Sequence, residues 1–285
     1  MTQEAIQPVA LAGTELHRLR ASGIDQEFEL RVALPVPGLM RPLPDRYDTL
    51  YVLDGDLFFG TAVEMTRLMS MLFGELPPLL VVGIGYGGTD PKRQGQLRNR
   101  DFTPTTPREM PGMREPPGWT PLLPEAERFG HADRFLAFLR DEVRPFVTAR
   151  YPVTGSASLF GSSMGGLFAT WALLTEPGLF ERYLIASPAL WWDNEALFGL
   201  EEQRAAARLE GRVFFGVGAQ EEAASIPMLA QFRMITNVRA MAERLSARGH
   251  PSFEVHHHVF DGESHTSVVP VVLTRALRTL YRRPG

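Results

Sequence analysis

The sequence predicts an α/β fold with a mostly parallel central sheet and helices packed on both faces. Short apolar segments alternate along the chain with longer amphipathic ones, as expected when helices connect the strands of a parallel sheet. The run Leu79–Ile84 is apolar throughout, which is typical of a strand buried on both faces. The 285 residues are 44% hydrophobic, and no linker or internal repeat divides them. We therefore expect a single domain over residues 1–285.

An antiparallel hairpin is expected at the N-terminal edge of the sheet. Residues 14–21 and 26–35 flank the turn residues Ser22 and Gly23. In the second segment apolar residues alternate with polar or small ones, as they do in a strand with one buried face.

The remaining elements alternate between strands and helices. Strands are expected at 49–53, 79–84, 158–160, 182–186, 213–217 and 253–260, and helices at 61–73, 133–149, 167–174, 195–209, 227–248 and 267–281. Pro145 should kink its helix or mark the final turn. The proline-rich segment 89–130 is expected to be irregular. A connection this long is usually a lid or binding segment, and the alternative is a solvent-facing insertion without a role.

Composition excludes several classes of function. A net charge of −4 argues against a general nucleic-acid binder, and the absence of cysteine excludes disulfides, thiolate metal sites and a cysteine nucleophile. The first residues lack the basic and apolar regions of a signal peptide, and no apolar stretch is long enough to span a membrane. We expect a cytoplasmic protein that needs no cofactor and no metal.

The motif Gly161-Ser162-Ser163-Met164-Gly165 lies between an apolar run and a helical pattern. This strand–turn–helix context predicts a nucleophile elbow, in which a strained turn exposes the Ser163 oxygen above the carboxyl edge of the sheet. The turn is expected to close only because Gly161 and Gly165 have no Cβ. The Met164 N–H would then lie at a helix N-terminus, where it can donate to a developing oxyanion.

A serine nucleophile needs a base, usually a histidine, and often an acid that orients the base. Of the seven histidines, His265 lies in a short loop after the last strand, where a general base is expected. Glu221 and Glu222 follow the penultimate strand, and either can orient His265; we favour Glu221. The order Ser, Glu, His along the chain is that of α/β-hydrolases. The Asp56 N–H, after an early strand, is a candidate for the second oxyanion donor.

Two other patterns are set aside. His256 and His258 would point to one face of a strand, but no third zinc ligand stands at a fitting spacing. The glycines of Gly83-Ile84-Gly85-Tyr86-Gly87 resemble a dinucleotide-binding fingerprint, but they are expected to lead into a polar loop and not into a helix.

Six segments occur in an order that resembles a known family. They are Tyr51-Val52-Leu53-Asp54-Gly55-Asp56, Arg98-Asn99-Arg100-Asp101-Phe102-Thr103-Pro104, Gly161-Ser162-Ser163-Met164-Gly165-Gly166, Ser187-Pro188-Ala189-Leu190-Trp191-Trp192, Gly218-Ala219-Gln220-Glu221 and Gly262-Glu263-Ser264-His265. From about residue 15 onward the chain resembles the putative-esterase branch of the α/β-hydrolases. That branch includes the ferric-enterobactin and salmochelin trilactone esterases and, more distantly, S-formylglutathione hydrolase and the mycolyltransferases.

The resemblance implies an α/β-hydrolase fold with Ser163 as nucleophile, His265 as base and the Met164 and Asp56 N–H groups as the oxyanion hole. Glu221 stands where the family has its acid, although some siderophore esterases work with a Ser–His pair. Segment 89–130 falls where the family places structure that covers the substrate.

Four side chains are candidate substrate contacts. In a siderophore esterase, Arg98 and Arg100 would meet an anionic catecholate; the alternative for Arg100 is an internal ion pair with Asp101. Trp191 and Trp192 would either form the wall of an acyl pocket or pack beneath the elbow.

The sequence therefore predicts a serine esterase that cleaves small-molecule carboxylic esters through an acyl-enzyme on Ser163, with siderophore trilactones as a narrower hypothesis. One alternative is an acyltransferase that uses the same acyl-enzyme, because only the acceptor differs. The other is a non-catalytic binding protein built on a hydrolase scaffold.

Overall fold

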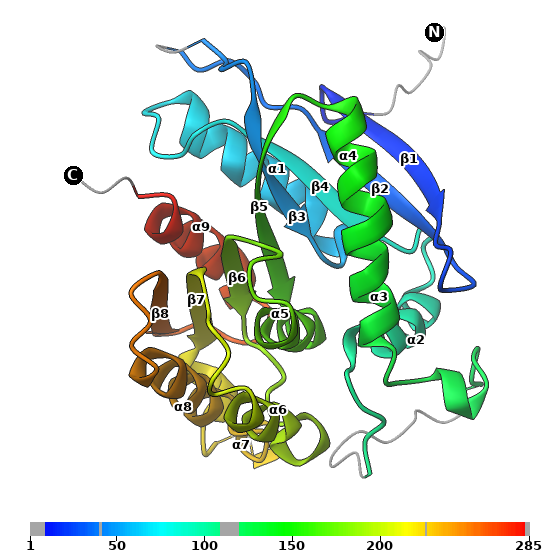
Figure 1. The fold of residues 1–285 in the computed structure, drawn as a ribbon, viewed down its shortest axis with the longest axis vertical. Coiled ribbons are helices and arrows are strands. Elements are labelled where there is room, and N and C mark those ends of the chain that lie inside the picture. Colours follow the sequence, from blue (N-terminus) through cyan, green and yellow to red (C-terminus); the bar gives the residue numbers. More distant parts are fainter. Residues whose placement is uncertain (1–8, 40–41, 109–119, 226, 283–285) are drawn as a thin grey trace, which may run out of the picture.

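The computed structural model describes residues 9–39, 42–108, 120–225 and 227–282 of the chain. In this part of the chain eight strands form one sheet in the order β1-β2-β4-β3-β5-β6-β7-β8 (Figure 1). Their bounds are β1 Thr14–Arg20, β2 Glu27–Ala33, β3 Tyr47–Val52, β4 Leu79–Gly85, β5 Val153–Ser162, β6 Arg182–Ala186, β7 Gly211–Gly218 and β8 Phe253–Phe260. The β1–β2 and β2–β4 pairs are antiparallel and the other pairs are parallel. The predicted fold class and hairpin are confirmed.

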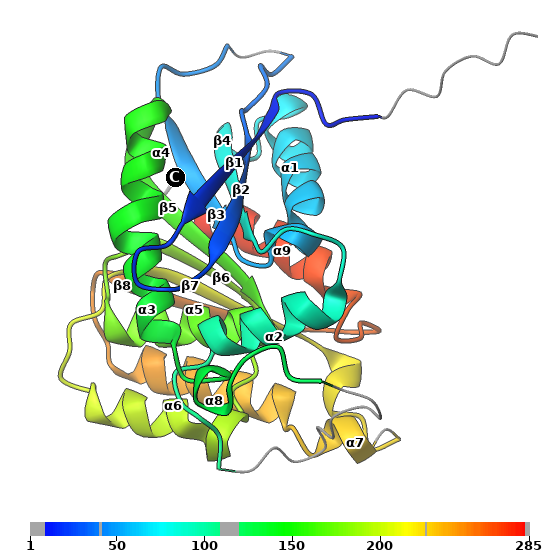
Figure 2. The same ribbon diagram turned by 90° about the vertical axis from the view of Figure 1, so that its right-hand side faces the viewer.

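Helices cover both faces of this sheet. Their bounds are α1 Gly55–Met71, α2 Pro91–Phe102, α3 Ala132–Phe138, α4 Arg144–Arg150, α5 Met164–Thr175, α6 Trp192–Gln203, α7 Pro227–Ala230, α8 Met234–Ala247 and α9 Val268–Leu280. Helices α1 and α9 pack on one face, and α3, α4, α5 and α8 pack on the other (Figures 1 and 2).

The two hydrophobic layers follow from alternation along fully buried strands. On β3, Leu50 and Val52 face the layer that contains α1 and α9, and Tyr51 faces the opposite layer. On β4, Val81 faces the layer that contains α1 and α9, and Val82 faces the opposite layer. The buried apolar strands place the carboxyl ends of β3, β5, β6, β7 and β8 at one edge of the sheet, where the sequence predicts the active site.

Segment 89–130 is not irregular throughout, and this expectation was wrong for residues 91–102. They form α2, whose N-cap Asp90 accepts a hydrogen bond from the Lys92 N–H at 2.9 Å, with Pro91 at the first helical position. Both are standard helix-start signals that the proline content of the segment obscured. Residues 109–119 of the predicted lid lie outside the described part of the chain.

Two of the long helices predicted from the sequence are interrupted in the structure. The helix expected at 133–149 is interrupted by a π-helical turn, Leu139–Val143, just before Pro145, which has no N–H for the i−4 carbonyl. The helix expected at 227–248 is divided into α7 and α8, with Arg233 between them in a left-handed conformation at φ 49°.

Helix α1 also begins earlier than expected, at Gly55 instead of residue 61. Asp54, in a left-handed conformation (φ 51°, ψ 47°), makes the turn directly from β3 into the helix. The helix N-terminus is therefore at the carboxyl edge of the sheet, beside the nucleophile motif.

Candidate active site

Ser163 lies at the turn between β5 and α5, in the middle of the sheet. Its backbone has φ 56° and ψ −116°, a conformation that L-residues rarely adopt. The turn is attached to the neighbouring strand because the Ser163 N–H donates to the Ala186 carbonyl at 2.9 Å. The Ser163 carbonyl accepts from the Ala189 N–H at 3.1 Å. This geometry is that of a nucleophile elbow.

Two glycines make the elbow sterically possible, but they are not the pair expected from the sequence. A Cβ on Gly161 would lie 2.2 Å from the Gly165 carbonyl oxygen, and one on Gly166 would lie 2.9 Å from the Pro188 Cα. A Cβ on Gly165 would meet nothing closer than the Asp54 carboxylate, at 3.4 Å. The expectation was right for Gly161 and wrong for Gly165, because the motif does not reveal which backbone approaches which.

His265 and Glu221 are in direct contact. His265 Nδ1 is 2.6 Å from Glu221 Oε2. The other carboxylate oxygen, Oε1, accepts from Ser187 Oγ at 2.6 Å and from the Gly218 N–H at 2.7 Å. Glu221 is buried, with 1% of its side chain exposed. A carboxylate held from two sides in this way orients the imidazole, and Nε2 is then the basic atom when Nδ1 carries the proton.

Glu222, the alternative acid, is directed elsewhere. Its carboxylate accepts from the Thr236 N–H at 2.7 Å and from Thr236 Oγ1 at 2.6 Å. Thr236 lies in the first turn of α8, so Glu222 satisfies that helix N-terminus and does not contact His265. Glu221 thus contacts the imidazole of His265, and Glu222 contacts the N-terminus of α8.

Ser163 and His265 line the same cavity, which has a volume of about 490 Å³. Its other lining residues are Asp54, Asp56, Leu57, Phe58, Tyr86, Pro91, Gln94, Gly95, Arg98, Ser162, Thr266 and Val269. A larger depression, of about 700 Å³, involves Leu76 and Tyr281 and is lined by neither a histidine nor the elbow. On chemical grounds, the smaller cavity is therefore the candidate active site.

The two expected oxyanion donors are at helix N-termini. Met164 is the first residue of α5, and Asp56 is the second residue of α1. The Leu57 and Phe58 N–H groups both donate to the Asp54 carbonyl, at 2.8 and 3.0 Å. The Asp56 and Met164 N–H groups come too early in their helices to have an intrahelical acceptor, so they are available to a ligand.

Arg98 lines the cavity and is already paired. Its Nε and Nη2 donate to the two oxygens of Asp54 at 2.9 and 2.8 Å. Burial alone would lower the pKa of Arg98, but the Asp54 carboxylate outweighs it and raises that pKa. Beside this pair, burial first and the charge of Asp101 second raise the pKa of Tyr86 well above its usual value, so Tyr86 is neutral. The arginine wall of the cavity therefore carries little net charge.

The other three candidate substrate contacts lie elsewhere. Arg100 pairs with Asp101 at 2.6 and 2.9 Å and is buried, which confirms the ion-pair alternative. Trp192 is buried and donates to Thr105. Trp191 packs on the Phe232 ring, with a centroid distance of 4.5 Å. None of these three lines the cavity that contains Ser163.

Most residues of the two patterns that were set aside lie on strands of the sheet. His256 and His258 lie on β8, the edge strand. Gly83 and Gly85 lie within β4 and so do not form a phosphate-binding turn. The reason given for discarding that motif was nevertheless wrong, because a helix, α2, does follow it. Among the described residues, no helix combines the length and apolar character needed to cross a membrane.

Sequence reasoning missed several cavity residues, notably Tyr86, Gln94 and Leu57. The sequence did contain a signal for Tyr86. This residue directly follows the apolar run predicted as a strand, so it could have been expected at the edge of the sheet where the carboxyl ends of the parallel strands lie. Gln94 was hidden because α2 was not expected.

Comparisons with known proteins agree with this geometry. Residues 21–278 match the model of the family described as "Putative esterase". The chain is 29% identical over 283 residues to the ferri-bacillibactin esterase BesA of Bacillus subtilis, covering 96% of this chain and 92% of that protein. It is 39% identical over 153 residues to a siderophore enterobactin esterase of Emericella nidulans, covering 53% of this chain and 48% of that protein.

Among solved structures, the BES protein from Bacillus cereus superposes with a TM-score of 0.80 at 27% identity, covering 99% of this chain and 100% of that one. The match to the family model spans the elbow, the Glu221 turn and the His265 loop. The chain belongs to the putative-esterase family of the α/β-hydrolases, and it is a carboxylic-ester hydrolase.

Proposed function

We propose that this esterase hydrolyses the ester bonds of a siderophore, with Ser163, His265 and Glu221 as a catalytic triad. The observation that carries the proposal is the 2.6 Å contact between Glu221 and His265, at the cavity that His265 shares with the elbow serine. The relatives whose names include a siderophore supply the substrate class.

In the first half of the reaction, Ser163 Oγ attacks the ester carbonyl while His265 Nε2 takes the hydroxyl proton. The Met164 and Asp56 N–H groups donate to the oxyanion. Collapse of the tetrahedral intermediate breaks the bond to the alcohol oxygen, which receives the proton from His265. The acyl group remains on Ser163.

In the second half, His265 takes a proton from water, and the resulting hydroxide attacks the acyl carbon. The second tetrahedral intermediate collapses to release the carboxylic acid and returns the proton to Ser163. An acyltransferase would differ only in using an alcohol in place of water.

Apolar groups are proposed to make most of the contacts with the substrate. Leu57, Phe58, Pro91 and Val269 line the cavity, and the charge of Arg98 is balanced by Asp54. We propose Arg98 as a hydrogen-bond donor through the N–H groups that Asp54 leaves free, and not as an uncompensated cation. Arg100, Trp191 and Trp192 are not proposed as substrate contacts.

The first experiment tests the nucleophile. A fluorophosphonate should label Ser163, and Ser163→Ala should hydrolyse p-nitrophenyl acetate at no more than the background rate. Turnover by Ser163→Ala at the wild-type rate would show that the proposed mechanism is wrong.

The second experiment tests the substrate. Chromatography should show cleavage of ferri-bacillibactin or ferric-enterobactin at a kcat/KM well above that of p-nitrophenyl acetate. Cleavage of simple esters alone would remove the siderophore proposal and leave the esterase. Esters formed with added alcohols in place of free acid would favour the acyltransferase. The cytoplasmic location stays a prediction, which cell fractionation tests.

A further inference from the structure

We propose that Arg31, a residue of β2 outside the cavity, is a positioning residue that holds the Asp56 oxyanion donor in place. This inference rests on the proposed function, because it assumes that the Asp56 N–H stabilises an oxyanion. It concerns the Asp56 side chain, whose carboxylate contacts Arg31 on β2 and the Tyr86 N–H just after β4.

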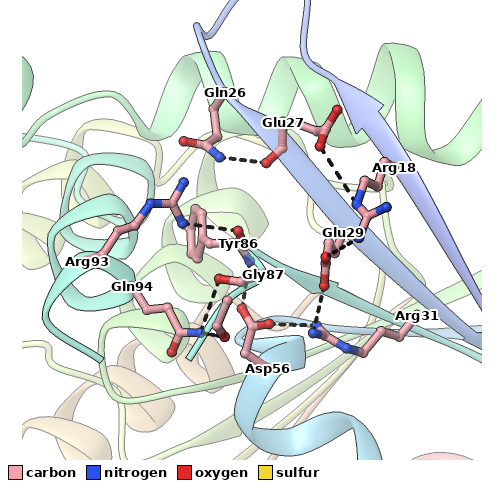
Figure 3. Close-up of polar contacts among 11 residues, drawn as sticks. Arg18, Gln26, Glu27, Glu29, Arg31, Asp56, Tyr86, Gly87, Arg93 and Gln94 are labelled. Atoms are coloured by element: carbon pink, nitrogen blue, oxygen red, sulfur yellow. Dashed lines mark hydrogen bonds and ion pairs between the residues drawn. The ribbon is translucent and has the colours of Figure 1, made fainter. Parts of the chain in front are cut away.

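Each oxygen of the Asp56 carboxylate has a partner on or next to the antiparallel strands β2 and β4 (Figure 3). Oδ2 accepts from the Tyr86 N–H, at the end of β4, at 2.6 Å. Oδ1 is 2.7 Å from Arg31 Nη1. The Asp56 side chain is 8% exposed, so this ion pair is largely shielded from water. One side chain thus attaches the first turn of α1 to two strands.

The surrounding backbone is shaped for this contact. A Cβ on Gly85 would lie 2.5 Å from Asp56 Oδ2 and 2.7 Å from Arg31 Nη1, so only glycine leaves room for the pair. A Cβ on Gly55 would lie 2.7 Å from the Gly83 carbonyl carbon and from the Ile84 nitrogen. The start of α1 therefore packs directly on the β4 backbone, where small displacements are resisted.

Arg31 is itself supported by a row of alternating charges across the hairpin (Figure 3). Arg31 Nη2 donates to Glu29 Oε2 at 2.8 Å, and Arg18 Nη2 donates to Glu29 Oε1 at 3.2 Å. Arg18 is 58% exposed and does not reach Asp56, whereas Arg31 is 25% exposed. The row supplies a matched pair of arginines, one that contacts Asp56 and one that does not.

The chemistry explains why the second donor needs such support. The Met164 N–H is placed by its covalent bond to Ser163, but the Asp56 N–H comes from a different element. Stabilisation of an oxyanion depends on donors 2.7–3.1 Å from the oxygen, so a shift of a few tenths of an ångström matters. Because Arg31 does not line the cavity, we infer that it acts through Asp56.

The test compares Arg31→Met with Arg18→Met in the full-length enzyme. Active sites are counted by the endpoint of fluorophosphonate labelling, so that kcat is expressed per competent molecule. Arg31→Met should lower kcat about tenfold, part of the 10²–10³-fold that loss of one donor costs, with KM for p-nitrophenyl acetate within about twofold. Arg18→Met should change neither constant by more than about twofold.

A second measurement separates positioning from general loosening. A trifluoromethyl ketone adds to the serine and places an oxyanion in the hole, so its inhibition constant should rise by the same factor as kcat falls. Arg31→Lys, which keeps the charge, should recover part of the loss. If Arg31→Met does not fold, Asp56→Asn applies the same test, since a neutral amide has one acceptor oxygen and cannot accept from both the Tyr86 N–H and Arg31.

Equal constants for Arg31→Met and Arg18→Met would overturn the inference, as would a loss confined to KM. The Ser163→Ala variant distinguishes this outcome from failure of the proposed function. If Ser163→Ala is inactive and Arg31→Met is normal, the mechanism stands and only the role of Arg31 is wrong.

Discussion

At the level of single residues, two adjacent glutamates in one short turn have different partners. Glu221 and Glu222 both lie in the 3₁₀ turn Ala219–Glu222, yet one carboxylate contacts His265 and the other the first turn of α8. Successive residues in a helical turn point about 100–120° apart, so neighbours cannot share a partner. Position along the turn, and not residue type, decides which glutamate contacts His265.

This division predicts different effects for the same substitution at the two positions. Glu221→Gln should lower kcat on the order of 10³-fold or more, because the imidazole loses the carboxylate that orients it and stabilises its charge. Glu222→Gln should leave kcat unchanged and reduce the free energy of unfolding by about 0.5 kcal/mol, through a weaker helix N-terminus. Steady-state kinetics and urea denaturation measure the two effects. Near-normal activity of Glu221→Gln would mean that the enzyme works with a Ser–His pair.

At the level of elements, the junction of β5 and α5 depends on two close backbone approaches. Gly161, in β5, faces the first turn of α5, and Gly166, in α5, faces Pro188 in the loop that follows β6. Gly165, although part of the Gly-x-Ser-x-Gly motif, has room for a methyl group. The motif therefore contains one glycine required by packing and one that is not.

A pair of alanine substitutions checks this. Gly161→Ala should reduce the free energy of unfolding by about 2 kcal/mol or more and abolish fluorophosphonate labelling, because the new Cβ collides with backbone that cannot move independently. Gly165→Ala should stay within about 1 kcal/mol of wild type and keep most of its activity. Equal destabilisation of the two variants would contradict the assignment.

At the level of the whole molecule, a buried tyrosine connects the sheet to helix α9. The hydroxyl of Tyr281, just after α9, is 2.7 Å from Ser158 Oγ on β5. Burial raises the pKa of Tyr281 to about 12, and burial also raises the pKa of Tyr183 on β6. In the unfolded chain both would titrate near their usual value of 10.0.

These shifts predict alkaline destabilisation. A group whose pKa is higher in the folded state keeps its stabilising contribution below pH 10 and loses it as pH rises through the folded pKa. Between pH 10 and 12 each such tyrosine should lower the free energy of unfolding by about 1.4 kcal/mol per pH unit. Urea denaturation at pH 9 and pH 11.5 measures the fall, which should be shallower in Tyr281→Phe. An unchanged slope would show that Tyr281 does not contribute.

The whole sheet also brings together the residues of the candidate active site from distant parts of the chain. Asp56 follows β3, Ser163 follows β5, Glu221 follows β7 and His265 follows β8. Parallel strands bring these positions to one edge, so the serine, the histidine and the glutamate were predictable from strand order and the position of each loop. The position of Met164 at a helix N-terminus was predicted from the strand–turn–helix pattern, whereas Asp56 was proposed only as a residue after a strand, because the helix there was expected to begin at residue 61.

The sequence by itself determined the alternation of strands and helices, the elbow and the loops that contain polar groups. Each depends on contacts between residues close in the chain or on hydrophobic periodicity, which the order of residues records. Helix α2 was missed although Asp90 and Pro91 are local signals, because the proline content of the surrounding segment was given more weight.

Only the tertiary structure decided which partners the long charged side chains take. Arg98 pairs with Asp54, 44 residues away, Arg31 with Asp56, and Arg100 with its neighbour Asp101. An arginine reaches several ångströms in many directions, so its partner depends on which carboxylate the packed core brings within reach. Local sequence therefore determined where the chemistry lies, and long-range packing determined which groups are free to take part in it.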